Sequence, residues 1–152
     1  MRTSPSRTDV RELTADDLDE VVRIDALHTG QETHDYWRRI FEAFLGNGDG
    51  EGTFGFGVES DRGLAGYLFG ETRAVEFGSE PCGWVFAVGI EERWLRRGVA
   101  TRLLGSTLER FREAGVDRIR TMVRRNDVPI LSFFRAAGFV GGPYVQLELE
   151  LS

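Results

Sequence analysis

Hydrophobic positions recur along the first part of the chain with the 3.6-residue period of helices, after one short run with the two-residue period of a strand. Residues 10–13 favour that strand. Thr14, with Asp17 three residues later, is a capping-box-like start for a helix. The apolar face of this helix consists of Leu18, Val21, Val22 and Ala26. A second helix is expected where Tyr36, Ile40, Phe41, Phe44 and Leu45 share a face. The glycine-rich run at 46–52 ends it.

The middle of the chain carries the patterns of strands. Residues 54–58 and 64–70 flank the turn at 61–63 and predict a hairpin. Residues 84–88 form a continuous apolar run between two glycines, Gly83 and Gly89. Such a run is typical of a strand buried on both faces, so we expect it in the middle of the sheet.

The last third predicts two more helices and two more strands. Leu103, Leu104, Leu108 and Phe111 mark a helix that begins near Gly98 and ends at Gly115. Residues 119–123 alternate as a strand, and Asn126-Asp127 then caps a helix with Pro129 in its first turn. Gly138 ends this helix, and alternation over 145–151 predicts a closing half-buried strand. The expected order is β-α-α-β-β-β-α-β-α-β.

Length and composition indicate one globular domain. The chain has 152 residues, of which 41% are hydrophobic and 29% charged. We expect a flexible N-terminus at 1–7 and a single domain over 8–152. The start M-R-T-S-P-S-R lacks the core of a signal peptide, and no run approaches the roughly 18 apolar residues of a membrane span, so a cytoplasmic protein without membrane contacts is expected. Cys82 has no second cysteine to pair with and is interpreted as a small core residue.

Charge is unevenly distributed. The net charge of −6 argues against a nucleic-acid binder, because phosphate neutralisation needs a basic surface. Residues 93–135 nevertheless hold eleven arginines and four acidic residues, a net charge of +7, which leaves −13 on the remainder. Arginine binds phosphate through several planar donors, so the basic block favours a phosphorylated ligand. The acidic remainder favours a cationic partner or serves as a solubilising surface.

The chemistry is concentrated between the buried strand and the helix that follows it. Arg96 and Arg97 precede Gly98, where a ligand can approach the main chain closely. The N–H groups at a helix start bind phosphate, so residues 96–101 predict a pyrophosphate cradle. An ordinary solvated helix start and a simple nucleotide or anion binder are the alternatives. The segment has no Walker lysine.

Two motifs together resemble the GNAT superfamily of acyl-CoA-dependent N-acetyltransferases. The diphosphate motif of that family, Gln/Arg-x-x-Gly-x-Gly/Ala, matches residues 95–100, with Leu95 in the first position. The second motif matches Asp127 in the usual Asn position, Phe134 in the usual Tyr position and the pair Gly138-Phe139. The resemblance implies an α+β fold with a mixed, mostly antiparallel sheet, about four flanking helices and a splay between the fourth and fifth strands.

The resemblance also implies a substrate and its contacts. Acetyl-CoA would donate an acetyl group to a primary amine of a small molecule or peptide, by direct attack in a ternary complex. The implied CoA-binding residues are Val88, Gly89, Ile90, Arg96, Arg97, Gly98, Val99, Ala100, Thr101, Asp127 and Phe134. No metal is expected, since His28 and His34 are six residues apart. Edge strands near the C-terminus offer a surface for a homodimer.

The catalytic base matters more than the acid. An alkyl ammonium with a pKa of about 10.4 costs roughly 4.6 kcal/mol to deprotonate at pH 7, whereas protonating a thiolate gains only about 2 kcal/mol. The family often places an acidic residue where this chain has Phe86, and a tyrosine where it has Phe134. The remaining candidates for the base are Asp25, His28, Tyr36, Glu76 and Glu80, of which Asp25 and Glu76 are favoured. The alternative function is an acyl-CoA sensor without turnover.

Overall fold

The computed structural model describes residues 10–46, 52–74, 78 and 80–152. The chain divides into two compact units, residues 1–121 and residues 122–152. The flexible segment expected at 1–7 lies outside the described residues, and the single domain over 8–152 stays a prediction. In the described part of the chain, no helix is both long and apolar enough to cross a membrane.

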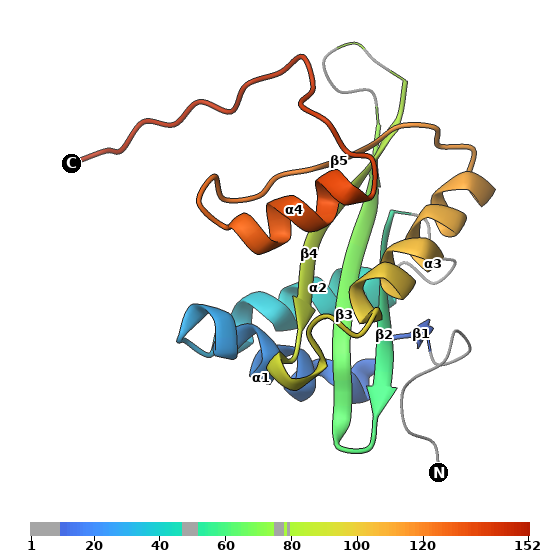
Figure 1. The fold of residues 1–152 in the computed structure, drawn as a ribbon, viewed down its shortest axis with the longest axis vertical. Coiled ribbons are helices and arrows are strands. Elements are labelled where there is room, and N and C mark those ends of the chain that lie inside the picture. Colours follow the sequence, from blue (N-terminus) through green and yellow to red (C-terminus); the bar gives the residue numbers. More distant parts are fainter. Residues whose placement is uncertain (1–9, 47–51, 75–77, 79) are drawn as a thin grey trace. The chain divides into compact units, whose positions relative to one another are not determined.

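The first unit contains a five-stranded sheet in the order β1-β2-β3-β4-β5 (Figure 1). Its strands are β1 (Val10–Glu12), β2 (Thr53–Ser60), β3 (Gly63–Arg73), β4 (Cys82–Ile90) and β5 (Ile119–Thr121). β1 to β4 pair antiparallel, and β4 pairs parallel with β5. The mixed, mostly antiparallel sheet of an α+β fold is therefore confirmed.

Helices cover both faces of this sheet. In the first unit they are α1 (Leu18–Thr29), α2 (His34–Gly46) and α3 (Val99–Glu113), with short 3-10 turns η2 (Ala15–Asp17) and η3 (Glu92–Trp94). Tyr67 and Phe69 of β3 join the core cluster of α1 and α2. Their neighbours on β3 face the other way, because a side-chain carbon on Gly66 would lie 3.0 Å from Val99 of α3. The second unit contains α4 (Val128–Ala136).

The start of α1 follows the predicted capping box. The Thr14 side chain accepts a hydrogen bond from the N–H of Asp16, and the Asp17 side chain accepts one from the N–H of Thr14. The first turn is a 3-10 turn, so the α-helix itself begins at Leu18. Two free N–H groups are thereby satisfied at the helix start.

The strand at the centre of the sheet is β3, which corrects the prediction for residues 84–88. Residues 64–70 of β3 are all buried, whereas Trp84 and residues 86–88 of β4 are only partly buried. β5 pairs with just three residues of β4, so β4 is covered along only part of its length. The apolar run in β4 reflects a strand with one open edge, which the period of the sequence cannot distinguish from a fully buried strand.

The closing strand predicted over 145–151 is wrong. Residues 139–152 contain no helix or strand, and Val145, Leu147, Leu149 and Leu151 are 80–87% exposed. A strand is stable only with a hydrogen-bonded neighbour, and no described strand pairs with this segment. Alternation alone does not supply that neighbour.

Candidate functional site

The β4 strand has an open edge over its second half. β5 pairs with β4 only from Gly83 to Val85, and the Thr121 hydroxyl donates to the Val85 carbonyl at 2.8 Å, at the last pair. Beyond Val85, no described strand pairs with this side of β4. The resemblance implies a splay between the fourth and fifth strands, and their pairing does end at Val85.

Alternation along β4 determines which backbone groups face the open edge. The Glu91 N–H donates to Ala65 of β3 at 2.9 Å, so the groups of Gly89 also point toward β3. The N–H groups of Val88 and Ile90 therefore point to the open edge. The Ile90 carbonyl on that edge already accepts a hydrogen bond from Nε2 of His28 at 3.0 Å. A carbonyl only accepts, so Nε2 of His28 carries the hydrogen.

The turn before α3 has the backbone of an anion-binding loop. Arg96 has φ +62° and Gly98 has φ +82°, both in the left-handed region. Gly98 is the N-cap of α3 and supplies no capping side chain. The first helical hydrogen bond runs from Arg102 N–H to the Gly98 carbonyl at 3.0 Å. The N–H groups of residues 99–101 thus have no acceptor among the described residues and are available to a ligand.

A second feature of this turn is the Arg102 guanidinium, which the sequence reasoning missed. Its Nε and Nη2 atoms are buried without a hydrogen-bond partner in the described part of the chain. Its Nη1 atom lies 3.7 Å from the position of a side-chain carbon built on Gly98. Arg102 follows Gly98 by four residues, which places it one helical turn away on the same face, and that spacing was the signal in the sequence. The unpaired donors suit a phosphate.

Arg96 and Arg97 are both exposed beside this turn. The Arg97 guanidinium lies 5.6 Å from the ring centre of Trp94, a residue that is only 7% exposed. Stacking on an aromatic ring leaves the donors of an arginine available, since they lie in its plane. The two arginines therefore add positive charge beside the free N–H groups.

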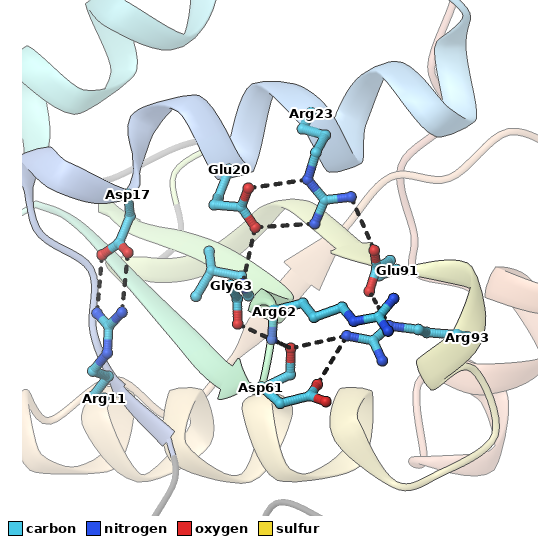
Figure 2. A network of polar contacts seen from close by, with 11 residues as sticks. Arg11, Asp17, Glu20, Arg23, Asp61, Arg62, Gly63, Glu91 and Arg93 are labelled. Carbon is cyan, nitrogen blue, oxygen red and sulfur yellow. Dashed lines mark hydrogen bonds and ion pairs between the residues drawn. The ribbon is translucent and has the colours of Figure 1, made fainter.

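An ion-pair network holds the end of β4 and the turn η3 against α1 (Figure 2). Glu91 binds Arg23 of α1 at 2.9 Å through one oxygen and Arg93 at 3.0 Å through the other. Arg23 also binds Glu20, whose Oε1 accepts the Leu64 N–H at 3.0 Å. Burial opposes ionisation of Glu91, but the two guanidinium groups outweigh it and lower the pKa of its carboxyl group. The segment leading to the cradle is thus anchored.

Asp25 lies among aromatic residues on the α1–α2 face of the sheet. Its Oδ2 atom accepts hydrogen bonds from Nε1 of Trp37 at 3.1 Å and from the Thr33 hydroxyl at 3.4 Å. Burial, then Asp25, then Glu71 raise the pKa of Tyr36, so the two carboxylates act on one phenol. The other Asp25 oxygen, Oδ1, has no hydrogen-bond partner among the described residues. It is available to a donor from a ligand.

The other predicted site residues are spread over the chain. Glu76 lies outside the described residues. Glu80 is exposed, and its carbonyl accepts the Cys82 thiol hydrogen at 3.4 Å. In the second unit, the Asp127 carboxylate caps α4 by accepting the Ile130 N–H at 3.3 Å.

Phe134, a CoA contact implied by the resemblance, and Cys82, an expected core residue, are both buried. Phe134 is 2% exposed, and its ring centre lies 5.1 Å from that of Phe133 and 5.0 Å from that of Phe139. These contacts are those of a packing aromatic residue. Cys82 is also 2% exposed, which confirms the expectation of a small core residue. Within the described residues, no group of three or more histidine, cysteine or acidic side chains is placed to bind a metal.

The sequence matches a family model over most of its length. The model describes the acetyltransferase (GNAT) family and matches residues 11–139. The chain belongs to this family. The comparison with curated proteins gives no match.

Solved structures share the fold of this GNAT protein. The aminoglycoside N-acetyltransferase AAC(6')-Iy in complex with CoA is 16% identical, with a TM-score of 0.79 over 93% of each chain. An aminoglycoside acetyltransferase from an uncultured soil metagenomic sample, in complex with sisomicin, is 15% identical, with a TM-score of 0.71 over 94% of this chain and 95% of that one. A transcriptional regulator from Bacillus halodurans C-125 is 17% identical, with a TM-score of 0.78 over 93% and 98%. At these identities the similarity establishes the fold alone.

Proposed function

We propose that this GNAT protein transfers an acetyl group from acetyl-CoA to a primary amine. The observation that carries the proposal is the continuity between two donor sets. The open β4 edge, with the N–H groups of Val88 and Ile90, leads through the anchored η3 turn to the uncapped start of α3. This arrangement suits a long ligand with amide groups at one end and a diphosphate at the other.

Each set of donor groups is matched to one part of the CoA molecule. The free N–H groups of residues 99–101, with Arg96, Arg97 and Arg102, suit its diphosphate. The pantetheine arm would pair with the open β4 edge as an added strand, which places the thioester beside residues 88–90. Asp127 and Phe134, in the second unit, are further proposed contacts that rest on the family motif.

The acceptor is proposed to be a cationic amine. Asp25 offers an unpaired carboxylate oxygen, and Glu71 adds a second negative charge near Tyr36. Two of the structural neighbours are named as aminoglycoside acetyltransferases, one of them in complex with sisomicin. We assign Asp25 to holding the ammonium group and receiving its proton. His28, bound to β4, and Glu76, outside the described residues, are the further candidates for the base.

The test is turnover on a defined set of amines. Acetyl-CoA is incubated with the protein and a panel of polyamines, aminoglycosides and N-terminal peptides, and thiol release is followed. We expect amine-dependent release that falls on the order of 10²-fold in Asp25→Asn, in keeping with the loss of a general base. Asp35→Asn is the control, because the Asp35 side chain is 90% exposed and, within the part of the chain that the structure describes, pairs only with Arg38 of the same helix.

Binding measurements separate the alternatives. A sensor without turnover would be stabilised by CoA yet release no thiol with any amine. This alternative is motivated by Phe86 and Phe134, which stand where the family often has residues that transfer protons. A simple anion binder would bind ADP as tightly as CoA. Either result would contradict the proposed acetyl transfer. A homodimer is also proposed, and sedimentation of the active protein tests it.

A further inference from the structure

The Tyr67 side chain crosses from β3 to β4 and ends over Gly89. Tyr67 is paired with Gly89 in the sheet. A side-chain carbon built on Gly89 would lie 2.6 Å from the Tyr67 hydroxyl oxygen and equally close to the adjacent ring carbons. No real carbon fits at that distance, so the hydroxyl occupies the space that a side chain at Gly89 would need. Glycine at this position allows the phenol to reach β4.

The ring of Tyr67 is fixed in that place. Tyr67 is 2% exposed, and its ring makes edge-to-face contacts with Trp37 at 5.5 Å and with Phe69 at 5.9 Å. Trp37 is in turn held by its hydrogen bond to Asp25. Buried aromatic rings packed in this way have one rotamer, so the position of the hydroxyl is determined by the core. Such a group needs no rearrangement before it acts on a ligand.

The Tyr67 hydroxyl is a hydrogen-bond donor that has no acceptor among the described residues. None of the hydrogen bonds among the described residues uses it, and its oxygen is not one of their fully buried unpaired polar atoms, so it keeps some accessible surface for a ligand. Burial, and then the charge of Asp25, raise the pKa of Tyr67 well above its ordinary value. The phenol therefore stays protonated at neutral pH, which excludes it as a base.

We propose that the Tyr67 hydroxyl donates a hydrogen bond to the acyl oxygen during acetyl transfer, together with a backbone N–H of the open β4 edge. This inference rests on the proposed function. The amine nitrogen attacks the thioester carbon, and the carbonyl electron pair moves onto oxygen. Two donors then stabilise that negative charge. The pair returns as the carbon–sulfur bond breaks, and the leaving thiolate takes up the proton that the attacking nitrogen loses. The base has removed the first proton of the ammonium group before the attack.

Hydrogen bonding suits Tyr67 better than proton transfer to the sulfur. A thiol has an ordinary pKa of about 8.5, below the value of about 10 for a phenol, so a thiolate does not readily take the proton of a tyrosine. A fixed neutral donor, by contrast, stabilises an oxyanion without losing its proton. The catalytic contribution of Tyr67 is thus electrostatic.

The experiment compares Tyr67→Phe with the wild-type protein in the thiol-release assay. We expect kcat to fall on the order of 10²-fold, as for the loss of one oxyanion donor, with KM for acetyl-CoA within about twofold. Thr107→Val is the matched control. Thr107 is a fully buried hydroxyl on α3, across the sheet, which donates to Leu103. Its loss is expected to leave kcat unchanged.

Gly89→Ala tests the same position without removing the hydroxyl, and serves if Tyr67→Phe does not fold. The added carbon displaces the phenol, so kcat is expected to fall while KM for acetyl-CoA stays within about threefold, because the backbone N–H groups remain. An unchanged kcat in the folded variants, or a loss confined to KM, would overturn the role of Tyr67 and leave the proposed function intact. Absence of turnover in the wild-type protein overturns the proposed function, and the role of Tyr67 with it.

Discussion

A single carboxylate, that of Asp17, joins the first strand to the first helix. It accepts the Thr14 N–H at 2.8 Å and two guanidinium hydrogens of Arg11 at 2.9 and 3.0 Å. Burial opposes its ionisation, but the bonds from Arg11 and Thr14 outweigh that cost and lower the pKa of the Asp17 carboxyl group. Asp17 is 7% exposed, so this pair is better shielded from solvent than most surface ion pairs.

Asp17→Asn is therefore expected to destabilise the protein in a pH-dependent way. A carboxyl group with a lowered pKa in the folded state contributes stability above its unfolded pKa of about 3.9, and this stability is lost as the pH falls through the folded pKa. At pH 7 we expect the free energy of unfolding to fall by about 1–3 kcal/mol, and the difference from wild type to shrink below pH 4. Urea unfolding at pH 7 and pH 3 measures it. If the two proteins differ by the same unfolding free energy at pH 7 and pH 3, the charge of Asp17 does not stabilise the fold.

At the scale of an element, the start of α3 combines backbone strain with N–H groups that have no hydrogen-bond acceptor among the described residues. Arg96 is the one non-glycine residue with positive φ among the described residues. A conformation of this kind costs on the order of 1 kcal/mol or more and persists only where the surroundings impose it. Here the network of Glu91, Arg23 and Arg93 holds the preceding segment, and the N–H groups of residues 99–101 have no acceptor among the described residues. The strained turn and the free donors belong to one binding feature.

Gly98→Val is expected to weaken CoA binding by at least about tenfold. A β-branched side chain does not adopt φ +82°, so the turn must change and the N–H groups of α3 move. Calorimetric titration with CoA measures the affinity, and the melting temperature shows whether the variant is folded. Gly105→Ala is the control, since Gly105 lies within the same helix and an added carbon meets nothing within 4 Å. We expect it to keep its CoA affinity and to gain about 0.5–1 kcal/mol of stability.

At the scale of the whole molecule, the C-terminal segment presents apolar side chains to solvent. Leu147, Leu149 and Leu151 are 87%, 82% and 85% exposed and alternate with polar residues. A row of exposed apolar residues with the period of a strand favours pairing with another chain. The net charge of −6 opposes association only weakly at physiological salt, because screening shortens its range.

We therefore expect concentration-dependent self-association that depends on this segment. The double variant Leu147→Ser and Leu149→Ser should shift the equilibrium toward monomer by about tenfold or more, because it removes apolar area from the contact. Sedimentation velocity at several concentrations measures the shift, and circular dichroism checks the fold. A wild-type protein that stays monomeric at all concentrations would refute the expectation.

The sequence by itself determined most of the local structure. The Thr14–Asp17 capping box, the 61–63 turn and the Asp127 cap depend on side chains that bond to their own neighbours, so they are visible in a short window of residues. The family motif at residues 95–100 likewise located the start of α3. These features need no knowledge of distant contacts.

Tertiary structure alone decided the rest, because it depends on which segments meet. The open edge of β4 arises where β5 stops pairing, and the apolar run there was predicted to be a fully buried strand. The strand over 145–151 did not form without a neighbour. The Tyr67 hydroxyl at Gly89 and His28 at Ile90 each join residues whose proximity depends on the fold. Periodicity records which way a side chain faces, whereas only packing determines what it meets.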